Sequence, residues 1–259
     1  MMIRKFAMVL LVVLSLPLPA GAVDLRLVYI DQDASPYLAG SGTAVPGRPG
    51  IAVELVQRAV SRLGGTLHLT RLPARRMVEE VKAGRQDGIL GFRHSEERAR
   101  DLVFPMRNGQ PDLTRYAARL AHSLYRRRGD GITWDGRQVG GLRAPVAVSS
   151  TQLVSDALLA QGVEIIRIES SGQMFAMLAL GRVDAVVIID ALGDRQMREQ
   201  GNGQIEKLAP PVLVEDFHVP VSRHFYGANR DFTERLWQSI GSLRDATYAE
   251  LTPVYLANP

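Results

Sequence analysis

The sequence predicts an α/β protein of two lobes, each a mixed sheet flanked by helices. The first observation is an internal repeat: residues 51–91 and 148–188 share one order of apolar and polar positions, at an offset of 97 residues. Each copy has the pattern of a helix, a strand, a second helix and a second strand. Two further segments, 116–125 and 217–221, are extended in pattern and can cross between the copies. Two repeated units with two crossings predict a hinge and a ligand-binding cleft between the lobes.

In each copy, the residues that end the second helix have a physical reason to do so. Gly84 and Gly181 each follow an apolar helical stretch, where Gly adopts the left-handed conformation that ends a helix. A basic residue follows at the negative end of the helix dipole. Asp87 or Asp184, a good turn former, then precedes a buried apolar strand. Chance could explain the shared tetrapeptide alone, since Gly-Arg-x-Asp is a common helix ending. It does not explain why about forty positions match in the same order.

The elements of the first lobe follow from periodicity and turn residues. Residues 24–30 alternate toward a strand, and 31–50, rich in Gly, Pro, Ser and Ala, predicts a loop. Helical spacing of apolar residues over 51–63 ends at Gly64. The remaining expected elements are a strand at 67–72, a helix at 75–83, a strand at 88–92, a short helix capped by Ser95, and a short apolar segment at 102–105.

The second lobe repeats this order. Ser170 is the expected N-cap of a helix over 173–179. A last helix over 229–243 carries apolar residues spaced to face a core. The other expected elements are strands at 145–148, 165–168 and 185–189 and a helix at 151–160.

The N-terminus has the pattern of a signal peptide. Arg4 and Lys5 precede the apolar run 6–16, then prolines and the small residues 20–22. The run is too short for a membrane span, which needs about 20 apolar residues, and the prolines argue against an uncleaved anchor. We therefore expect a periplasmic protein with three parts. These are a signal peptide at 1–22, lobe 1 at 23–117 with 222–259, and lobe 2 at 118–221.

Composition excludes several classes of function. The chain has no Cys, so it has neither disulfides nor a lipidated Cys, and its formal net charge is only +4. This bias is too weak to indicate nucleic acid, and the arginines at 126–128 favour a solvated strand end. The five His show no metal-binding spacing, and no nucleophile motif occurs. We expect no cofactor, no metal and no enzymatic activity.

The order of motifs resembles the bacterial extracellular solute-binding proteins of family 3, the polar amino acid type. The resemblance covers nearly all of the chain beyond the signal peptide, and no single motif is highly specific. Its motifs are Gly-Ile-Ala-Val-Glu-Leu at 50–55, Ala-Gly-Arg-Gln-Asp-Gly at 83–88, Ser-Glu-Glu-Arg at 95–98, Val-Phe-Pro at 103–105, Gly-Arg-Val-Asp-Ala-Val-Val at 181–187, and the tail at 221–226. It implies the two-lobed periplasmic binding protein fold, a small-molecule ligand, a monomer and an inner-membrane ABC permease as partner.

The resemblance also implies site residues. Relatives bind the ligand carboxylate with an Arg at the Arg98 position, in a short helix whose N–H groups also favour anions. The alternative is a surface Arg paired with Glu96 or Glu97. Asp31 and Tyr37 match a polar contact and an aromatic that packs on the ligand; loop capping and local packing are their alternatives.

Several positions depart from the family pattern. Two residues after Gly91, relatives often have Thr or Ser, and this chain has Arg93. The Asp that binds a ligand ammonium falls at Ile189, with Asp190 one residue later. Without the ammonium partner and with an added Arg, the sequence favours an anionic solute over an α-amino acid.

Two further candidates complete the predicted site. A Gly-Thr-Thr turn of the relatives is replaced by residues 149–152, where Ser150 and Thr151 could still bind an anion at a helix N-terminus. Arg76 resembles part of a Pro-Trp-x-Arg variant whose aromatic is Ala74 here.

Three functions stay open from sequence. The first is a binding protein that delivers solute to an ABC importer. The second is a periplasmic sensor or orphan binder without a permease. The third is an enzyme on the same scaffold, similar to cyclohexadienyl dehydratase.

Overall fold

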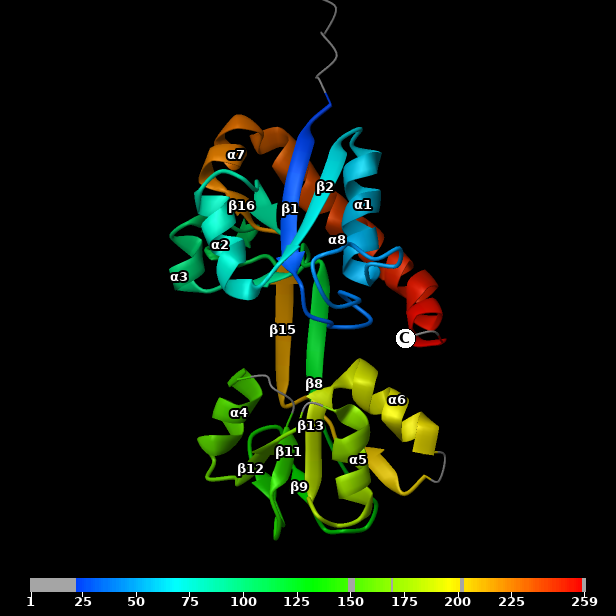
Figure 1. Cartoon of the computed structure of the whole chain (residues 1–259). Coiled ribbons are helices and arrows are strands. Elements are labelled where there is room, and N and C mark those ends of the chain that lie inside the picture. Colours follow the sequence, from blue (N-terminus) through cyan, green and yellow to red (C-terminus); the bar gives the residue numbers. More distant parts are fainter. Residues whose placement is uncertain (1–21, 149–151, 169, 201–202, 258–259) are drawn as a thin grey trace, which may run out of the picture.

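The computed structural model describes residues 22–148, 152–168, 170–200 and 203–257 and shows two lobes joined by two long strands (Figure 1). The predicted signal peptide, apart from Ala22, lies outside the described residues. In the part that is described, no helix is long and apolar enough to cross a membrane.

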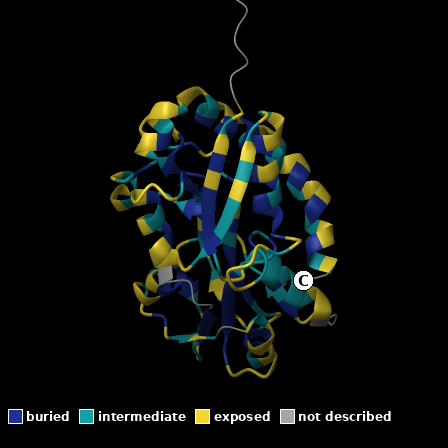
Figure 2. Cartoon of the chain, turned by 45° about the horizontal axis from the view of Figure 1, so that its top comes forward, coloured by how far each residue is buried: buried dark blue, intermediate teal, exposed yellow. Residues whose placement is uncertain are grey.

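The first lobe is a five-stranded sheet in the order β2-β1-β3-β16-β5, with β1 parallel to both β2 and β3. Helices lie on both sides of it (Figure 1), and burial falls from β1, which is largely buried, to the edge strand β2, which is mostly intermediate or exposed (Figure 2). Its elements are β1 (Asp24–Ile30), α1 (Ile51–Arg62), β2 (Thr66–Leu72), α2 (Ala74–Lys82), β3 (Gly88–Ile89), α3 (Glu96–Ala99), β5 (Leu102–Val103), β16 (Val221–Ser222), α7 (Arg223–Ala228) and α8 (Arg230–Ala257).

The second lobe contains most of a seven-stranded sheet whose main order is β12-β11-β13-β8-β15-β4. The antiparallel strands β8 and β15 extend from this lobe to the other one (Figure 1). Its elements are β8 (Ala118–Arg127), β11 (Val146–Val148), α4 (Gln152–Leu159), β12 (Ile165–Arg167), α5 (Ser171–Ala179), β13 (Ala185–Ile189), α6 (Asp190–Gln200), β14 (Ile205–Lys207) and β15 (Leu213–His218). The last strand of the sheet, β4 (Phe92–Arg93), pairs with the end of β15 and packs with the first lobe, where Phe92 joins the cluster of Val28 and Met77. Two small hairpins complete the chain: β6 (Met106–Arg107) with β7 (Gln110–Pro111), and β9 (Thr133–Trp134) with β10 (Val139–Gly140).

The two copies of the sequence repeat form the same local structure. Helix, strand, helix and strand follow in order in each copy, and Gly84 and Gly181 have φ of 71° and 69°. The repeated Asp is buried in both: Asp87 accepts hydrogen bonds from the backbone N–H and guanidinium of Arg26. Asp184 accepts them from the backbone N–H groups of Arg143 and Ala144 and from Arg127. Each Asp thus joins the end of a helix to the neighbouring sheet.

We expect the ionisation of Asp184 to make the protein less stable as the pH falls into the acid range. Burial opposes its ionisation, but two backbone N–H groups and the Arg127 guanidinium outweigh burial and lower the pKa of the carboxyl below its ordinary 3.8. A carboxyl with a depressed folded-state pKa stabilises the fold at neutral pH, and this contribution is lost as pH falls through that pKa. Asp184→Asn should therefore lower stability at pH 7 by about 1–3 kcal/mol and flatten its decline toward pH 3.

Thermal melts of both proteins between pH 7 and pH 3 measure this difference. Glu164→Gln, at an exposed position on the same lobe, is the control and should follow the wild-type curve. Parallel curves for the wild type and Asp184→Asn would contradict the assignment.

Three of the expected elements differ from the structure, and α6, α7, β14 and the two hairpins were not expected. The strand expected at 88–92 divides into β3 and β4, which belong to different sheets, because the chain turns at Gly91 with φ of 77°. The last helix continues to Ala257, because Leu251 and Tyr255 pack on Ile51. The return crossing is β15, which begins before the expected segment.

The arginines at 126–128 are a strand end, as expected, but two of them are not solvated. The guanidinium of Arg126 lies 2.7 Å from Glu206, and Arg127 pairs with Asp184. Their charges hold β14 and the helix end of the repeat against β8. The lobe boundaries predicted at 117/118 and 221/222 stay a prediction.

Candidate ligand-binding site

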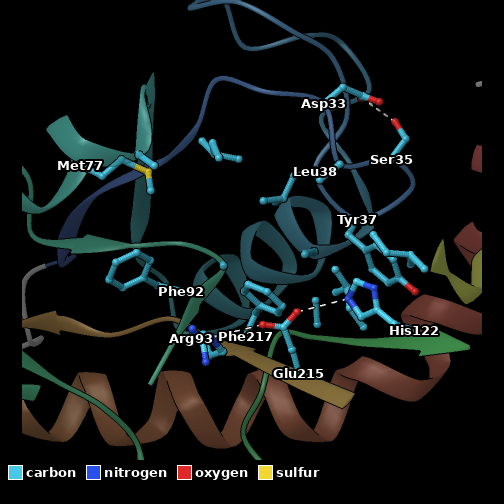
Figure 3. A pocket seen from close by; sticks show the side chains of 18 of the residues that line it. Asp33, Ser35, Tyr37, Leu38, Met77, Phe92, Arg93, His122, Glu215 and Phe217 are labelled. Carbon is cyan, nitrogen blue, oxygen red and sulfur yellow. Dashed lines mark hydrogen bonds and ion pairs between the residues drawn. The ribbon is translucent and has the colours of Figure 1, made fainter. Parts of the chain in front are cut away.

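A cavity of about 520 Å³ lies where the two crossing strands meet both lobes (Figure 3). Its walls come from the loop after β1, the start of α2, the segment from Gly91 to Arg98, both crossing strands, and the start of α6. The residues lining it are Ile30, Asp33, Ala34, Ser35, Tyr37, Leu38, Ala52, Ala74, Met77, Gly91, Phe92, Arg93, Arg98, Ala118, Leu120, His122, Ile189, Leu192, Glu215 and Phe217. Most of this wall is apolar, with a few charged groups.

Arg98 is a half-buried cation on the cavity wall. The Ser95 hydroxyl accepts a hydrogen bond from its backbone N–H, as expected for an N-cap. Its guanidinium donates to the Arg93 carbonyl at 2.8 Å and lies 3.9 Å from the centroid of the Phe92 ring. Burial, followed by the neighbouring charge of Arg93, lowers its pKa. Among the described residues no carboxylate forms an ion pair with it, so the alternative of a Glu96 or Glu97 pair is absent here.

Arg93 lines the cavity as well, but its charge is compensated. Its Nε lies 3.3 Å from Oε1 of Glu215, a residue of β15 that is only 7% exposed. The other carboxylate oxygen of Glu215 lies 3.3 Å from Nε2 of His122 on β8. Figure 3 shows the three side chains converging. This corrects the expectation that Arg93 adds a free positive charge, because a buried carboxylate neutralises it.

The loop after β1 brings Tyr37 to the cavity but leaves Asp31 away from it. Tyr37 packs against Tyr248 with ring centroids 6.1 Å apart. Burial and the charges of Asp190 and Asp194 raise the pKa of Tyr37 to about 12. Asp31 is not part of the lining; its backbone N–H donates to Leu72 and its carbonyl accepts from Gly42, so it shapes the loop.

Asp33 is the acid that this loop presents instead. Its Oδ1 accepts a hydrogen bond from the Ser35 hydroxyl at 2.8 Å (Figure 3). The same oxygen accepts a second hydrogen bond from the Gly40 N–H at 2.7 Å. The acid of this loop that lines the cavity is therefore Asp33 and not the predicted Asp31, and one of its oxygens already accepts two hydrogen bonds.

The other predicted residues divide as follows. Gly91 lines the cavity. Asp190 opens α6 beside the cavity and pairs with Lys207 at 2.7 Å, while its neighbour Ile189 forms the lining. Arg76 is exposed on α2 and is not part of the lining. Ser150 and Thr151 lie outside the described residues.

Sequence reasoning missed the polar groups of the crossing strands. Strand residues two apart share a face, and Ala118, Leu120 and His122 all line the cavity, as do Glu215 and Phe217 on β15. The alternation could have placed His122 on the face of an expected crossing strand. Nothing in the sequence indicates which face that is, because the fold alone decides it.

Solved structures with the same architecture match almost the whole chain. A histidine kinase sensor domain with similarity to periplasmic binding proteins has 20% identity and a TM-score of 0.56, over 92% of this chain and 97% of that one. The L-cystine solute receptor of Neisseria gonorrhoeae, in an unliganded open conformation, has 16% identity and a TM-score of 0.64, over 91% and 94%. An ancestral cationic amino acid solute-binding protein has 14% identity and a TM-score of 0.63, over 90% of this chain and 95% of that one.

The chain has the two-lobed periplasmic binding protein fold. This confirms the predicted fold class, and the similar structures include solute-binding proteins of the amino acid type, in agreement with the resemblance of the motifs. No protein-family model and no curated protein sequence matches the chain. At these identities the likeness establishes the fold alone.

Proposed function

We propose that this protein captures a small carboxylate-bearing solute in the cavity between its lobes. The observation that carries the proposal is Arg98, a half-buried guanidinium on the cavity wall with no ion-paired carboxylate among the described residues. Burying a charge without a partner is costly, and a planar guanidinium forms strong bidentate hydrogen bonds with a carboxylate. A ligand carboxylate would supply the missing partner.

The cavity suits a small molecule with an apolar body. A volume of about 520 Å³ falls in the ordinary range for small-molecule sites, about 300–1,000 Å³. Leu38, Met77 and Phe92 come from one lobe, and Ile189 and Leu192 from the other. Burying these apolar groups against a ligand removes them from water and lowers the free energy, which favours closure of the lobes around the ligand.

We further propose that the protein works outside the cytoplasm and delivers its ligand to an inner-membrane ABC permease. The signal-peptide pattern and the likeness to solute-binding proteins support this role. The two crossing strands support opening and closing, which lets a permease distinguish loaded from empty protein.

A sensing role is the second candidate. The match to a histidine kinase sensor domain of the same fold supports it, with 97% of that domain covered. Uptake of the radiolabelled ligand by cells that lack the gene separates the two roles. Lost uptake supports transport, whereas normal uptake with a lost transcriptional response to the ligand supports sensing.

Ligand binding itself is tested by thermal shift of the processed protein. Carboxylates are compared with the alcohols and amines of the same carbon skeletons. A ligand at a hundred times its Kd stabilises the fold by about 2.7 kcal/mol, so we expect a clear rise in melting temperature for carboxylates alone. A rise with amines or neutral alcohols and none with any carboxylate would contradict the proposal.

A further inference from the structure

The wall of the cavity carries a buried histidine that lacks hydrogen bonds. His122 is 1% exposed, and neither of its ring nitrogens has a hydrogen-bond partner among the described residues. Its Nε2 lies 3.3 Å from Oε2 of Glu215, but without hydrogen-bond geometry. Buried polar groups are nearly always satisfied, so an unsatisfied one on a cavity wall points to a missing partner.

The neighbour of His122 determines which kind of partner is missing. In a neutral imidazole one nitrogen donates and the other accepts. The Glu215 carboxylate favours the proton on Nε2, the nitrogen that faces it. Nδ1 is then a hydrogen-bond acceptor, and the group that satisfies it must be a donor.

The charges around the cavity favour a neutral donor over an ammonium. Glu215 is compensated by Arg93 at 3.3 Å, and Asp33 already accepts two hydrogen bonds at one oxygen. Asp190, beside the cavity, is paired with Lys207. An ammonium would enter a site that already contains the Arg98 cation and whose one acid without an ion pair among the described residues, Asp33, is held by hydrogen bonds within its own loop. A hydroxyl, in contrast, needs no compensating acid.

The strand register separates this donor from the carboxylate at Arg98. Arg93, whose carbonyl accepts from Arg98, pairs with Phe217 of β15, and His122 pairs with Leu213 of the same strand. Four residues of strand span about 13 Å of backbone, although the side chains of Arg93 and His122 both reach toward Glu215, which lies between these two positions on β15. The two polar groups of a ligand would therefore lie at opposite ends of an apolar body.

We propose that the ligand is a monocarboxylate with a hydroxyl at its far end, and that this hydroxyl donates to Nδ1 of His122. This inference rests on the proposed binding of a carboxylate by Arg98. It assigns His122 on the crossing strand to ligand recognition, with Glu215 as the positioning residue that sets its tautomer.

Three probes with the same number of heavy atoms test it by calorimetry: heptanoate, 6-hydroxyhexanoate and 6-aminohexanoate. They differ at one terminal group, which is a methyl, a hydroxyl or an ammonium. We expect 6-hydroxyhexanoate to bind about tenfold more tightly than heptanoate, the effect of one added hydrogen bond, and 6-aminohexanoate to bind most weakly. Equal affinities, tightest binding of the amine, or binding of none of the three while other carboxylates bind would overturn the inference.

His122→Phe tests the named residue. The ratio of the 6-hydroxyhexanoate affinity to the heptanoate affinity should fall from about ten to about one. His68→Phe, at an exposed His on β2, is the matched control and should keep the wild-type ratio. An unchanged ratio in a folded His122→Phe protein overturns the assignment, and the three wild-type affinities decide the ligand class even where that variant does not fold.

These outcomes distinguish the two proposals. Heptanoate binding that depends on Arg98 but gains nothing from the hydroxyl refutes the inference and leaves the proposed function intact. If no carboxylate of any skeleton binds, the proposed function fails and the inference fails with it.

Discussion

Replacing Arg98 with Ala should weaken carboxylate binding by about 2–5 kcal/mol, which corresponds to a roughly thirty-fold to few-thousand-fold rise in Kd. The loss is large because the guanidinium is half-buried and has no other charged partner on the described protein. Its two contacts within the protein, to the Arg93 carbonyl and the Phe92 ring, are local, so the fold should remain intact. Calorimetry with a carboxylate from the thermal-shift screen measures the effect.

Arg100→Ala is the matched control, because this exposed Arg ends the same short helix. Its Kd should equal that of the wild type. Arg98→Lys keeps the charge but loses the bidentate geometry, so we expect an intermediate affinity. An Arg98→Ala protein that binds the carboxylate normally would remove Arg98 from the site.

Replacing Arg71 with Met should both destabilise the fold and weaken ligand binding. Arg71 is 1% exposed on β2 and donates to three backbone carbonyls, at 3.3 Å to Ile30, at 3.2 Å to Ala44, and to Gly40. Its guanidinium also lies 5.1 Å from the Tyr29 ring centroid. These bonds hold the loop after β1 that presents Asp33 and Tyr37 to the cavity. Met fills a similar space without donors, so we expect a loss of about 2–4 kcal/mol in unfolding free energy.

Urea denaturation and calorimetry together test the role of Arg71. Arg75→Met, at an exposed position at the start of α2, should change stability by less than about 0.5 kcal/mol. The loop assignment also requires that Kd rise at temperatures where the Arg71→Met protein is fully folded. A variant that is less stable but binds with the wild-type Kd would show that Arg71 supports the core and not the site.

Local patterns predicted most of the elements because each depends on residues close together in the chain. The strands at 24–30 and 185–189 have the expected bounds, and Ser95 and Ser170 cap the helices that follow them. Alternation and capping are short-range effects, which one sequence contains in full. The length of α8 was not predictable in this way, because its last turns depend on packing against Ile51.

The candidate site was predictable only where it lies on a motif. Arg98 and Tyr37 line the cavity as expected, and Gly91 and Arg93 lie beside them. Asp31 and Arg76 do not line it, although each is close in sequence to residues that do. A motif fixes the order of residues along the chain, and a rotation of one residue on a helix or loop moves a side chain out of a cavity.

By itself, the sequence determined the repeat and the class of fold, because these follow from periodicity within forty or so neighbouring positions. The resemblance of its motifs also indicated Arg98, which lines the cavity. The tertiary structure alone decided the charge balance of the cavity. Arg93, His122 and Glu215 are far apart in the chain and meet because β4, β8 and β15 are neighbours in one sheet. A charge's partner depends on distances of a few ångströms, and only the folded chain sets those distances.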